Sequence, residues 1–111
     1  MIMAVIQVTE DNFDEVVMKC KKPVLLDFYA DWCGPCKMMS PIVEQICEEY
    51  ADAYVVGKVN VDEQPGLALK YQVMSIPMLV VMNLGVFAGK SVGAVDKEAV
   101  LALLRQAEQV K

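Results

Sequence analysis

The chain has 111 residues, a formal net charge of −5, 10 Lys and Arg residues and no histidine. Its length suits one domain over residues 1–111, and its 56% of apolar residues argues against disorder. The acidic balance disfavours nucleic acid and anionic membranes as partners. The lack of histidine excludes histidine-based acid–base catalysis and most familiar zinc and iron sites.

The first half of the chain alternates strand and helix patterns. A short strand is predicted over Ala4 to Val8, and Thr9 is a candidate N-cap for a helix that runs to about Cys20. Val24 to Ala30 is an apolar, aromatic run typical of a parallel strand buried on both faces. A long helix begins near Cys33, and its predicted buried positions are Met39, Ile42, Val43, Ile46, Cys47 and Tyr50.

The second half adds a valine-rich strand, a short helix and two further strands, predicted at Tyr54 to Val61, Pro65 to Tyr71, Met78 to Met82 and Val86 to Val92. A tight turn at Asn83 to Gly85 joins the last two strands into an antiparallel hairpin. Asp96 is the expected cap of a last helix. The order β-α-β-α-β-α-β-β-α predicts an α/β fold, with three layers (α/β/α) around a central five-stranded mixed sheet.

No segment has the pattern of a signal peptide or a membrane span. Met1 to Val8 is apolar, but no basic region precedes it and no small-residue cleavage pattern follows. The longest apolar stretch, Ile76 to Gly89, is interrupted by Asn83 and is too short to cross a bilayer. The four cysteines are not spaced like the framework of a small secreted domain, so we expect a cytoplasmic protein.

Cys33 and Cys36 stand at the predicted start of the long helix, with Gly34 and Pro35 between them. Attack on a disulfide needs a thiolate, and the positive end of a helix favours that anion. One turn apart, the two sulfurs lie on the same side of the helix and can be bridged. Pro35 fits the first turn, which does not need its N–H. The pattern predicts a redox-active Cys33–Cys36 disulfide and no bound cofactor.

The positions of the two cysteines suggest separate roles. Cys33, nearer the exposed loop, is expected to attack a target disulfide, and the deeper Cys36 then attacks Cys33 to release the reduced target. The alternative is half of a zinc site, which would need a second close pair, whereas Cys20 and Cys47 fall on separate helix faces. We therefore expect no metal, and we interpret Cys20 and Cys47 as packing residues rather than a regulatory disulfide.

The run from Val24 to Met38, with Trp32-Cys33-Gly34-Pro35-Cys36 at its centre, resembles the active-site segment of thioredoxins. The resemblance covers nearly the whole chain and continues in the segments Val59 to Asp62, Gln64 to Gly66, Ser75 to Pro77 and Val92 to Ala94. It implies the thioredoxin fold and a protein-disulfide reductase. Its expected partners are disulfide-containing proteins and a thioredoxin reductase that draws electrons from NADPH or ferredoxin, and we expect a monomer.

Asp27 is a carboxylate within an apolar strand, where burial should raise its pKa. By resemblance, it helps to take the proton from the Cys36 thiol; the alternative is a solvent-facing strand residue. The resemblance also places Lys58 near Asp27, which it would tune, although a lysine snorkelling at a strand edge is nearly as good an interpretation. Pro77 matches the family's cis-proline.

The resemblance further implies a substrate-binding surface around Cys33, made of Trp32, Gly34, Pro35, Ile76, Pro77, Gly93 and Ala94. Backbone groups of Ile76 would bind the substrate peptide as an added strand. Trp32 as a core residue is the alternative. Met74 and Met78 depart from the family's usual residues; we expect Met38 to fill the core and leave the place of Met78 open.

Two other functions remain open. One is a specialised thioredoxin-like oxidant or isomerase in an exported compartment, which the missing signal peptide and the Gly34-Pro35 pair disfavour. The other is a non-catalytic binding subunit that uses the same surface as a scaffold. The two intact cysteines, Cys33 and Cys36, disfavour that role as the only one.

Overall fold

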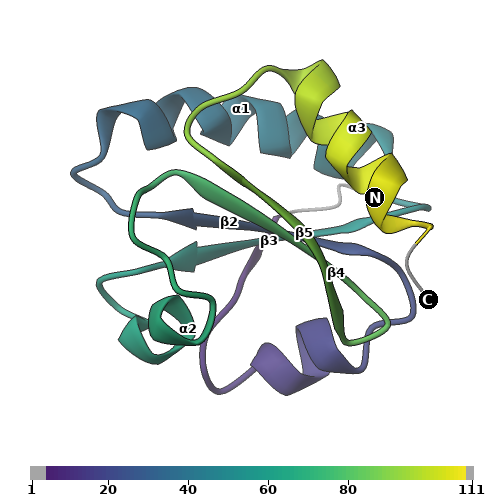
Figure 1. Ribbon diagram of the computed structural model, residues 1–111, viewed down its shortest axis with the longest axis horizontal. Helices are drawn as coiled ribbons and strands as arrows, with labels where there is room; N and C mark the ends of the chain where they lie inside the picture. The colour runs from purple at the N-terminus through teal and green to yellow at the C-terminus, as the bar shows by residue number, and fades with distance from the viewer. Residues whose placement is uncertain (1–4, 110–111) are drawn as a thin grey trace.

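A five-stranded mixed sheet forms the middle of the molecule (Figure 1). The computed structural model describes residues 5–109. The strands are β1 (Ile6–Gln7), β2 (Val24–Tyr29), β3 (Val55–Asn60), β4 (Met78–Asn83) and β5 (Val86–Val92). They lie in the order β1-β3-β2-β4-β5, and β3 pairs in parallel with both β1 and β2, whereas β4 pairs antiparallel with β2 and β5. The predicted mixed sheet is confirmed.

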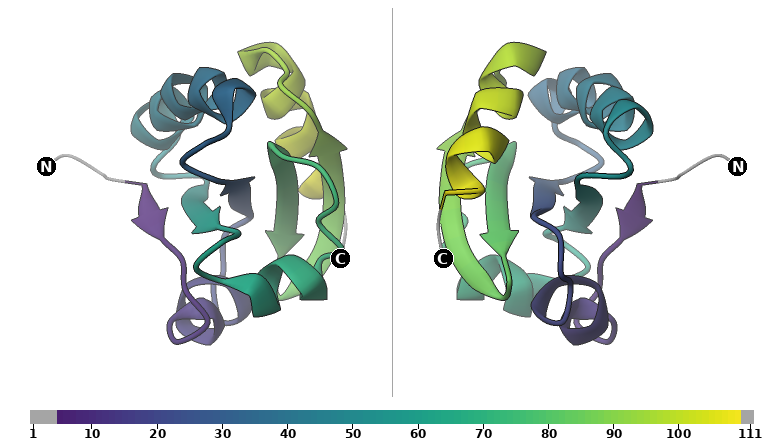
Figure 2. Two further views of the ribbon diagram at one scale, coloured as in Figure 1. Left: turned by 90° about the vertical axis from the view of Figure 1, so that its left-hand side faces the viewer. Right: turned by 90° about the vertical axis from the view of Figure 1, so that its right-hand side faces the viewer.

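Helices cover both faces of this sheet, as the side views show (Figure 2). One face carries α1 (Gly34–Glu49) and α3 (Lys97–Ala107), and the other carries η1 (Asp14–Met18) and α2 (Pro65–Lys70). Each face has its own apolar core. The α1–α3 side includes Leu25, Met39, Val43, Ile46, Leu79 and Leu104, and the other side includes Val17, Leu26, Phe28, Val59 and Val80. The three-layer α/β/α fold is confirmed.

Strand β2 runs through the centre of the sheet, which explains why its sequence is apolar at nearly every position. Leu25 packs into the core on the α1–α3 side, whereas Leu26 and Phe28 pack into the opposite core. Because successive side chains of a strand alternate between faces, Asp27 and Tyr29 point to the same side as Leu25, toward α1. The fold thus places a carboxyl group beneath the helix that carries the two cysteines.

Two elements at the N-terminus are shorter than the sequence predicts. Strand β1 covers only Ile6–Gln7, and Ala4, where we expected it to begin, lies outside the described residues. Thr9 does cap the following turn, because Thr9 Oγ1 accepts from the Asn12 backbone N–H at 3.2 Å and Asn12 Oδ1 accepts from the Thr9 N–H at 2.7 Å. The expected helix is reduced to η1, a single π-helical segment, since acidic and amide side chains before it favour a turn.

Asp96 is the N-cap of α3, as predicted, and its Oδ1 accepts a hydrogen bond from the Ala99 N–H at 2.9 Å. The Asp96→Ala variant is expected to lower the free energy of unfolding by about 1 kcal/mol, because that N–H loses its partner. Urea unfolding of both proteins measures the change. Glu98→Ala removes a carboxylate from the same first turn without removing the cap, so an equal loss in that control would contradict the assignment.

Candidate active site

The two cysteines lie at the N-terminus of α1 and are joined by a disulfide, with 5.3 Å between their Cα atoms. Cys33 is the N-cap residue in an extended conformation, and its Sγ accepts a hydrogen bond from the Cys36 backbone N–H at 3.2 Å. Pro35 occupies the first helical turn, as predicted. Because unpaired N–H groups and the helix dipole favour negative charge at this position, the same contact favours a Cys33 thiolate once the disulfide is reduced.

The exposed fractions of the two cysteine residues are nearly equal, contrary to the expectation that Cys33 lies nearer the surface and Cys36 deeper. Cys33 is 4% exposed and Cys36 is 3% exposed. The reason is that the disulfide packs as one unit against Ala30, Tyr29, Val61 and Ile76. The surroundings of the two cysteines do differ. Cys33 Sγ lies 3.8 Å from the Ile76 carbonyl oxygen, whereas Cys36 lines a pocket that it shares with Ser40 and Lys58.

The loop that contains Ile76 and Pro77 faces Cys33. The Ile76–Pro77 peptide bond is cis, as the resemblance implied. The Gly93 N–H donates to the Pro77 carbonyl oxygen at 2.8 Å, so this loop and the end of β5 lie side by side. Gly93 has a φ of +94°, a conformation that favours glycine. The fold thus brings Cys33, Ile76, Pro77 and Gly93 together from three separate parts of the chain.

Trp32 lies at the surface beside the disulfide, so its interpretation as a core residue is wrong. It is 71% exposed, and its indole Nε1–H donates to Asp62 Oδ2 at 2.9 Å. Gly34, Pro35 and Ala94 are exposed as well, and a Cβ added at Gly34 would meet open space. The sequence analysis gave Asp62 no role, although an indole N–H usually has a hydrogen-bond partner.

One methionine, Met38, differs from its predicted place. Met38 is 66% exposed, so the expectation that it fills the core is wrong; Met39 takes the inward position of that helical turn and is fully buried. Met78 is 2% exposed and packs in the core on the α2 side, whereas Met74 is 92% exposed. Of the remaining cysteines, Cys47 packs in the α1–α3 core and Cys20 against the opposite core, which fits the packing interpretation.

Asp27 is fully buried, so the alternative of a solvent-facing strand residue is wrong. Neither of its carboxylate oxygens has a hydrogen-bond partner among residues 5–109. Burial raises the pKa of Asp27 to about 6, and the positive charge of Lys58 opposes that rise. Asp27 lies opposite Lys58 of β3 and Leu79 of β4 in the sheet register, which places Lys58 beside it as the resemblance implied.

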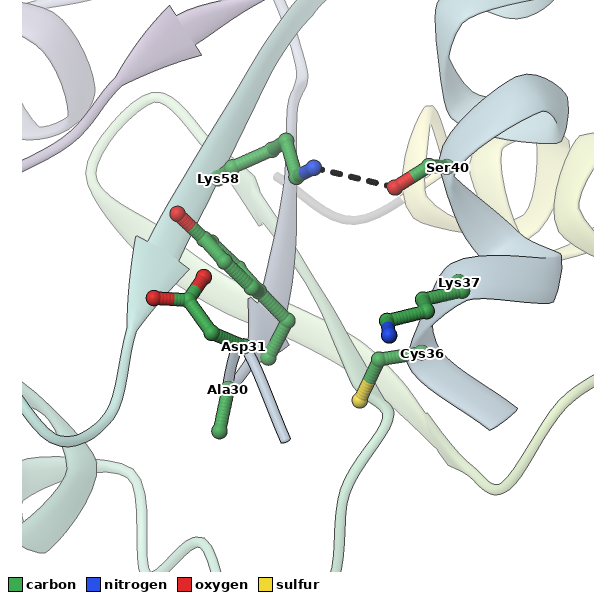
Figure 3. Close-up of a pocket in the computed structure, with 7 residues that line it drawn as sticks. Ala30, Asp31, Cys36, Lys37, Ser40 and Lys58 are labelled. Carbon is green, nitrogen blue, oxygen red and sulfur yellow. Dashed lines mark hydrogen bonds between the residues drawn. The ribbon is translucent and has the colours of Figure 1, made fainter. Parts of the chain in front are cut away.

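The side chain of Lys58 lies in a pocket of about 130 Å³ next to Cys36 (Figure 3). Its Nζ donates to Ser40 Oγ of α1 at 3.0 Å and lies 4.5 Å from the centroid of the Tyr29 ring. Ala30, Asp31 and Lys37 complete the lining. The sequence analysis gave Ser40 no role, because its only local signal is its position four residues after Cys36, on the same helical face.

The described part of the chain has neither a metal-binding cluster nor a membrane-spanning helix. No group of three or more Cys, Asp or Glu side chains there could hold a metal ion. None of the helices there has the length and apolar character needed to cross a membrane.

Comparison with known proteins identifies the family. The thioredoxin family model matches residues 4–106. The chain is 45% identical over 101 residues to the thioredoxin of Acidithiobacillus ferridurans, a match that covers 91% of this chain and 94% of the relative. It is 41% identical over 104 residues to the thioredoxin of Pyropia yezoensis, covering 94% and 97%. The chain therefore belongs to the thioredoxin family of thiol–disulfide oxidoreductases, with a redox-active pair at Cys33 and Cys36.

Proposed function

We propose that Cys33 and Cys36 reduce protein disulfides in two steps. The Cys33 thiolate attacks one sulfur of the target, the target's S–S bond breaks, and its other sulfur leaves as a thiolate that takes up a proton. Cys36 then loses its proton and attacks Cys33 Sγ. The mixed disulfide breaks, the second target sulfur leaves as a thiolate, and the Cys33–Cys36 disulfide forms. The target gains two electrons and two protons.

The observation that carries this assignment is the hydrogen bond from the Cys36 N–H to Cys33 Sγ at the N-cap of α1. It gives Cys33, and not Cys36, the position where a helix stabilises a thiolate. Cys33 is also the sulfur that lies against the Ile76 carbonyl oxygen, at the surface where a peptide would arrive. Cys36 is therefore assigned the resolving role.

Asp27 is the proposed acceptor for the Cys36 proton. It lies on the face of β2 that is turned toward α1, and the chain has no histidine that could take the proton instead. A general base works best when its pKa lies near the operating pH, and burial brings the pKa of Asp27 to about 6. Lys58, opposite Asp27, has the proposed role of limiting that rise through its positive charge.

The rim around the disulfide is the proposed substrate surface, and its residues are Trp32, Gly34, Pro35, Ile76, Pro77, Gly93 and Ala94. The first three and Ala94 are exposed, Ile76 and Gly93 are half-buried, and Pro77 is buried. The backbone of Ile76 would pair with an extended substrate peptide as an added strand. Support comes from the Gly93–Pro77 hydrogen bond, which holds two of these segments side by side. The hydrogen bond from Trp32 to Asp62 holds the indole at the rim.

The proposed partners are disulfide-containing proteins and a thioredoxin reductase, for a monomeric protein that acts in the cytoplasm. The relatives' name, thioredoxin, supports the two kinds of partner. Reduction of insulin disulfides tests the activity, first with dithiothreitol and then with an NADPH-linked or a ferredoxin-linked reductase. We expect acceleration over dithiothreitol alone and recharging by one of the two reductases. No acceleration over dithiothreitol would overturn the proposal.

The Asp27→Asn variant is expected to reduce insulin about tenfold or more slowly at pH 7, because an amide cannot accept the Cys36 proton. Wild-type turnover should rise as the pH passes about 6, where Asp27 ionises, and the variant should lack this rise. Rates measured from pH 5 to 8 show both effects. Asp31→Asn is the control, since Asp31 is an exposed carboxylate that lines the pocket beside Cys36. An unchanged pH profile in Asp27→Asn would remove Asp27 from the mechanism.

A further inference from the structure

The ammonium group of Lys58 is engaged by groups other than the Asp27 carboxylate on the neighbouring strand. Lys58 stands directly opposite Asp27 in the parallel register of β2 and β3. Its Nζ nevertheless donates to Ser40 Oγ (Figure 3). The same Nζ lies over the ring of Tyr29. Both oxygens of Asp27 lack a hydrogen-bond partner among the described residues. A buried carboxylate beside a lysine would ordinarily pair with it, so its isolation needs a cause.

We propose that Ser40 is a positioning residue, whose hydroxyl holds the Lys58 ammonium against α1 and keeps it from pairing with the Asp27 carboxylate. Ser40 follows Cys36 by four residues, so both side chains lie on the face of α1 that looks onto the pocket. The face of the Tyr29 ring attracts the ammonium from the β2 side. Ser40 and Tyr29 thus hold Lys58 from two sides.

The position of Lys58 matters because it decides how strong a base Asp27 is. An ammonium in direct contact with a carboxylate stabilises the ionised form and weakens the base, whereas an unpaired buried carboxylate is a stronger base. The proposal thereby rests on the proposed function of Asp27 as proton acceptor. By holding Lys58 away, Ser40 would keep Asp27 able to take up a proton near neutral pH.

The other elements around Asp27 offer no competing explanation. Strand β4 presents Leu79 opposite it, and α3 contributes apolar side chains to this side of the core. Titratable groups near the pocket come from α1 (Cys36 and Lys37), from β3 (Lys58), from β2 itself (Tyr29) and from the residue Asp31 that follows it. Lys37 and Asp31 are exposed, so water screens their charges more strongly than that of half-buried Lys58.

The pKa of Asp27 in the reduced protein, followed by carbon NMR of its carboxyl group, tests the proposal. In Ser40→Ala, Lys58 is released toward Asp27, and we expect the pKa of Asp27 to fall by about one pH unit. Alanine favours helix, so α1 should be retained. Ser40→Thr keeps the hydroxyl and should keep the wild-type pKa. An unchanged or raised pKa in Ser40→Ala would overturn the proposal.

The same Ser40→Ala substitution, made in a protein that already carries Lys58→Met, shows whether Ser40 acts through Lys58. Lys58→Met removes the ammonium, so Ser40→Ala added to it should leave the pKa of Asp27 where Lys58→Met puts it. An equal fall in both backgrounds would overturn the positioning role. The rise of the insulin reduction rate with pH should move with the pKa of Asp27. If the pKa falls in Ser40→Ala and the rate profile stays, the positioning of Lys58 by Ser40 stands and the role of Asp27 as proton acceptor fails.

Discussion

Replacement of Cys33 by serine is expected to slow insulin disulfide reduction by about a thousandfold or more, because a hydroxyl supplies no thiolate at neutral pH. Without that thiolate no mixed disulfide forms, and the Cys33–Cys36 disulfide cannot close. The rate measured with a limiting amount of dithiothreitol reports the loss. Cys20→Ser, which changes a half-buried cysteine against the opposite core, is the matched control and should keep the wild-type rate.

The companion variant separates the roles of the two thiols. Cys36→Ser keeps the attacking thiolate but removes the resolving one, so a covalent adduct between Cys33 and the target should accumulate. Mass spectrometry under non-reducing conditions detects the adduct. This distinction cannot come from exposure, since both cysteines are almost fully covered in the disulfide. If Cys33→Ser trapped the adduct and Cys36→Ser did not, the roles would be reversed and the N-cap argument would be wrong.

The elements that carry the cysteines could be predicted from local pattern alone. The apolar run of β2 and the periodic stripe of α1 are long signals. Strand β2 ends one residue before its predicted end, and α1 begins one residue after Cys33, near which we expected its start. Asp96 as a cap is similarly a local property. Met38 could have been placed by the same reasoning, because Met39 already occupied the inward stripe and its neighbour is turned about 100° away.

The surroundings of the cysteines depend on contacts between distant segments. The facing of Cys33 and Ile76, the Gly93–Pro77 hydrogen bond and the Lys58–Ser40 contact each join residues that lie far apart in the sequence. The first was implied only by resemblance to a family, which also placed Gly93 and Pro77 on one surface but gave no hydrogen bond between them. The third arises from how α1 lies over β3, which no local pattern encodes. For the same reason the equal burial of the two sulfurs was not foreseen.

Burial of Asp27 should make the free energy of unfolding depend on pH. The native carboxyl keeps its proton up to a pH of about 6, whereas in the unfolded chain it ionises near 3.8. Between these values the unfolded state binds fewer protons than the native state, so the stability contributed by this group falls as the pH rises. The loss of stability that comes from ionising Asp27 is absent below about pH 3.8 and complete above about pH 6. A pKa difference of about 2 corresponds to about 3 kcal/mol.

Asp27→Asn cannot ionise, so its free energy of unfolding relative to the wild type should improve by about 3 kcal/mol between pH 4 and pH 7.5. Urea unfolding of the two oxidised proteins across this range measures the difference, in which the other carboxyl groups cancel. Asp31→Asn, which changes an exposed carboxylate, is the control. A difference between Asp27→Asn and the wild type that did not change with pH would contradict the buried ionisation.

The same substitution is thus expected to slow turnover and to stabilise the protein at neutral pH. The gain in stability follows from burial alone, whereas a buried carboxylate without a role in the chemistry would leave the pH profile of the rate unchanged. Natural proteins keep a destabilising buried group where activity requires it. A slower rate with an altered pH profile in Asp27→Asn, alongside the gain in stability, would therefore identify the buried carboxylate of Asp27 as part of the redox chemistry.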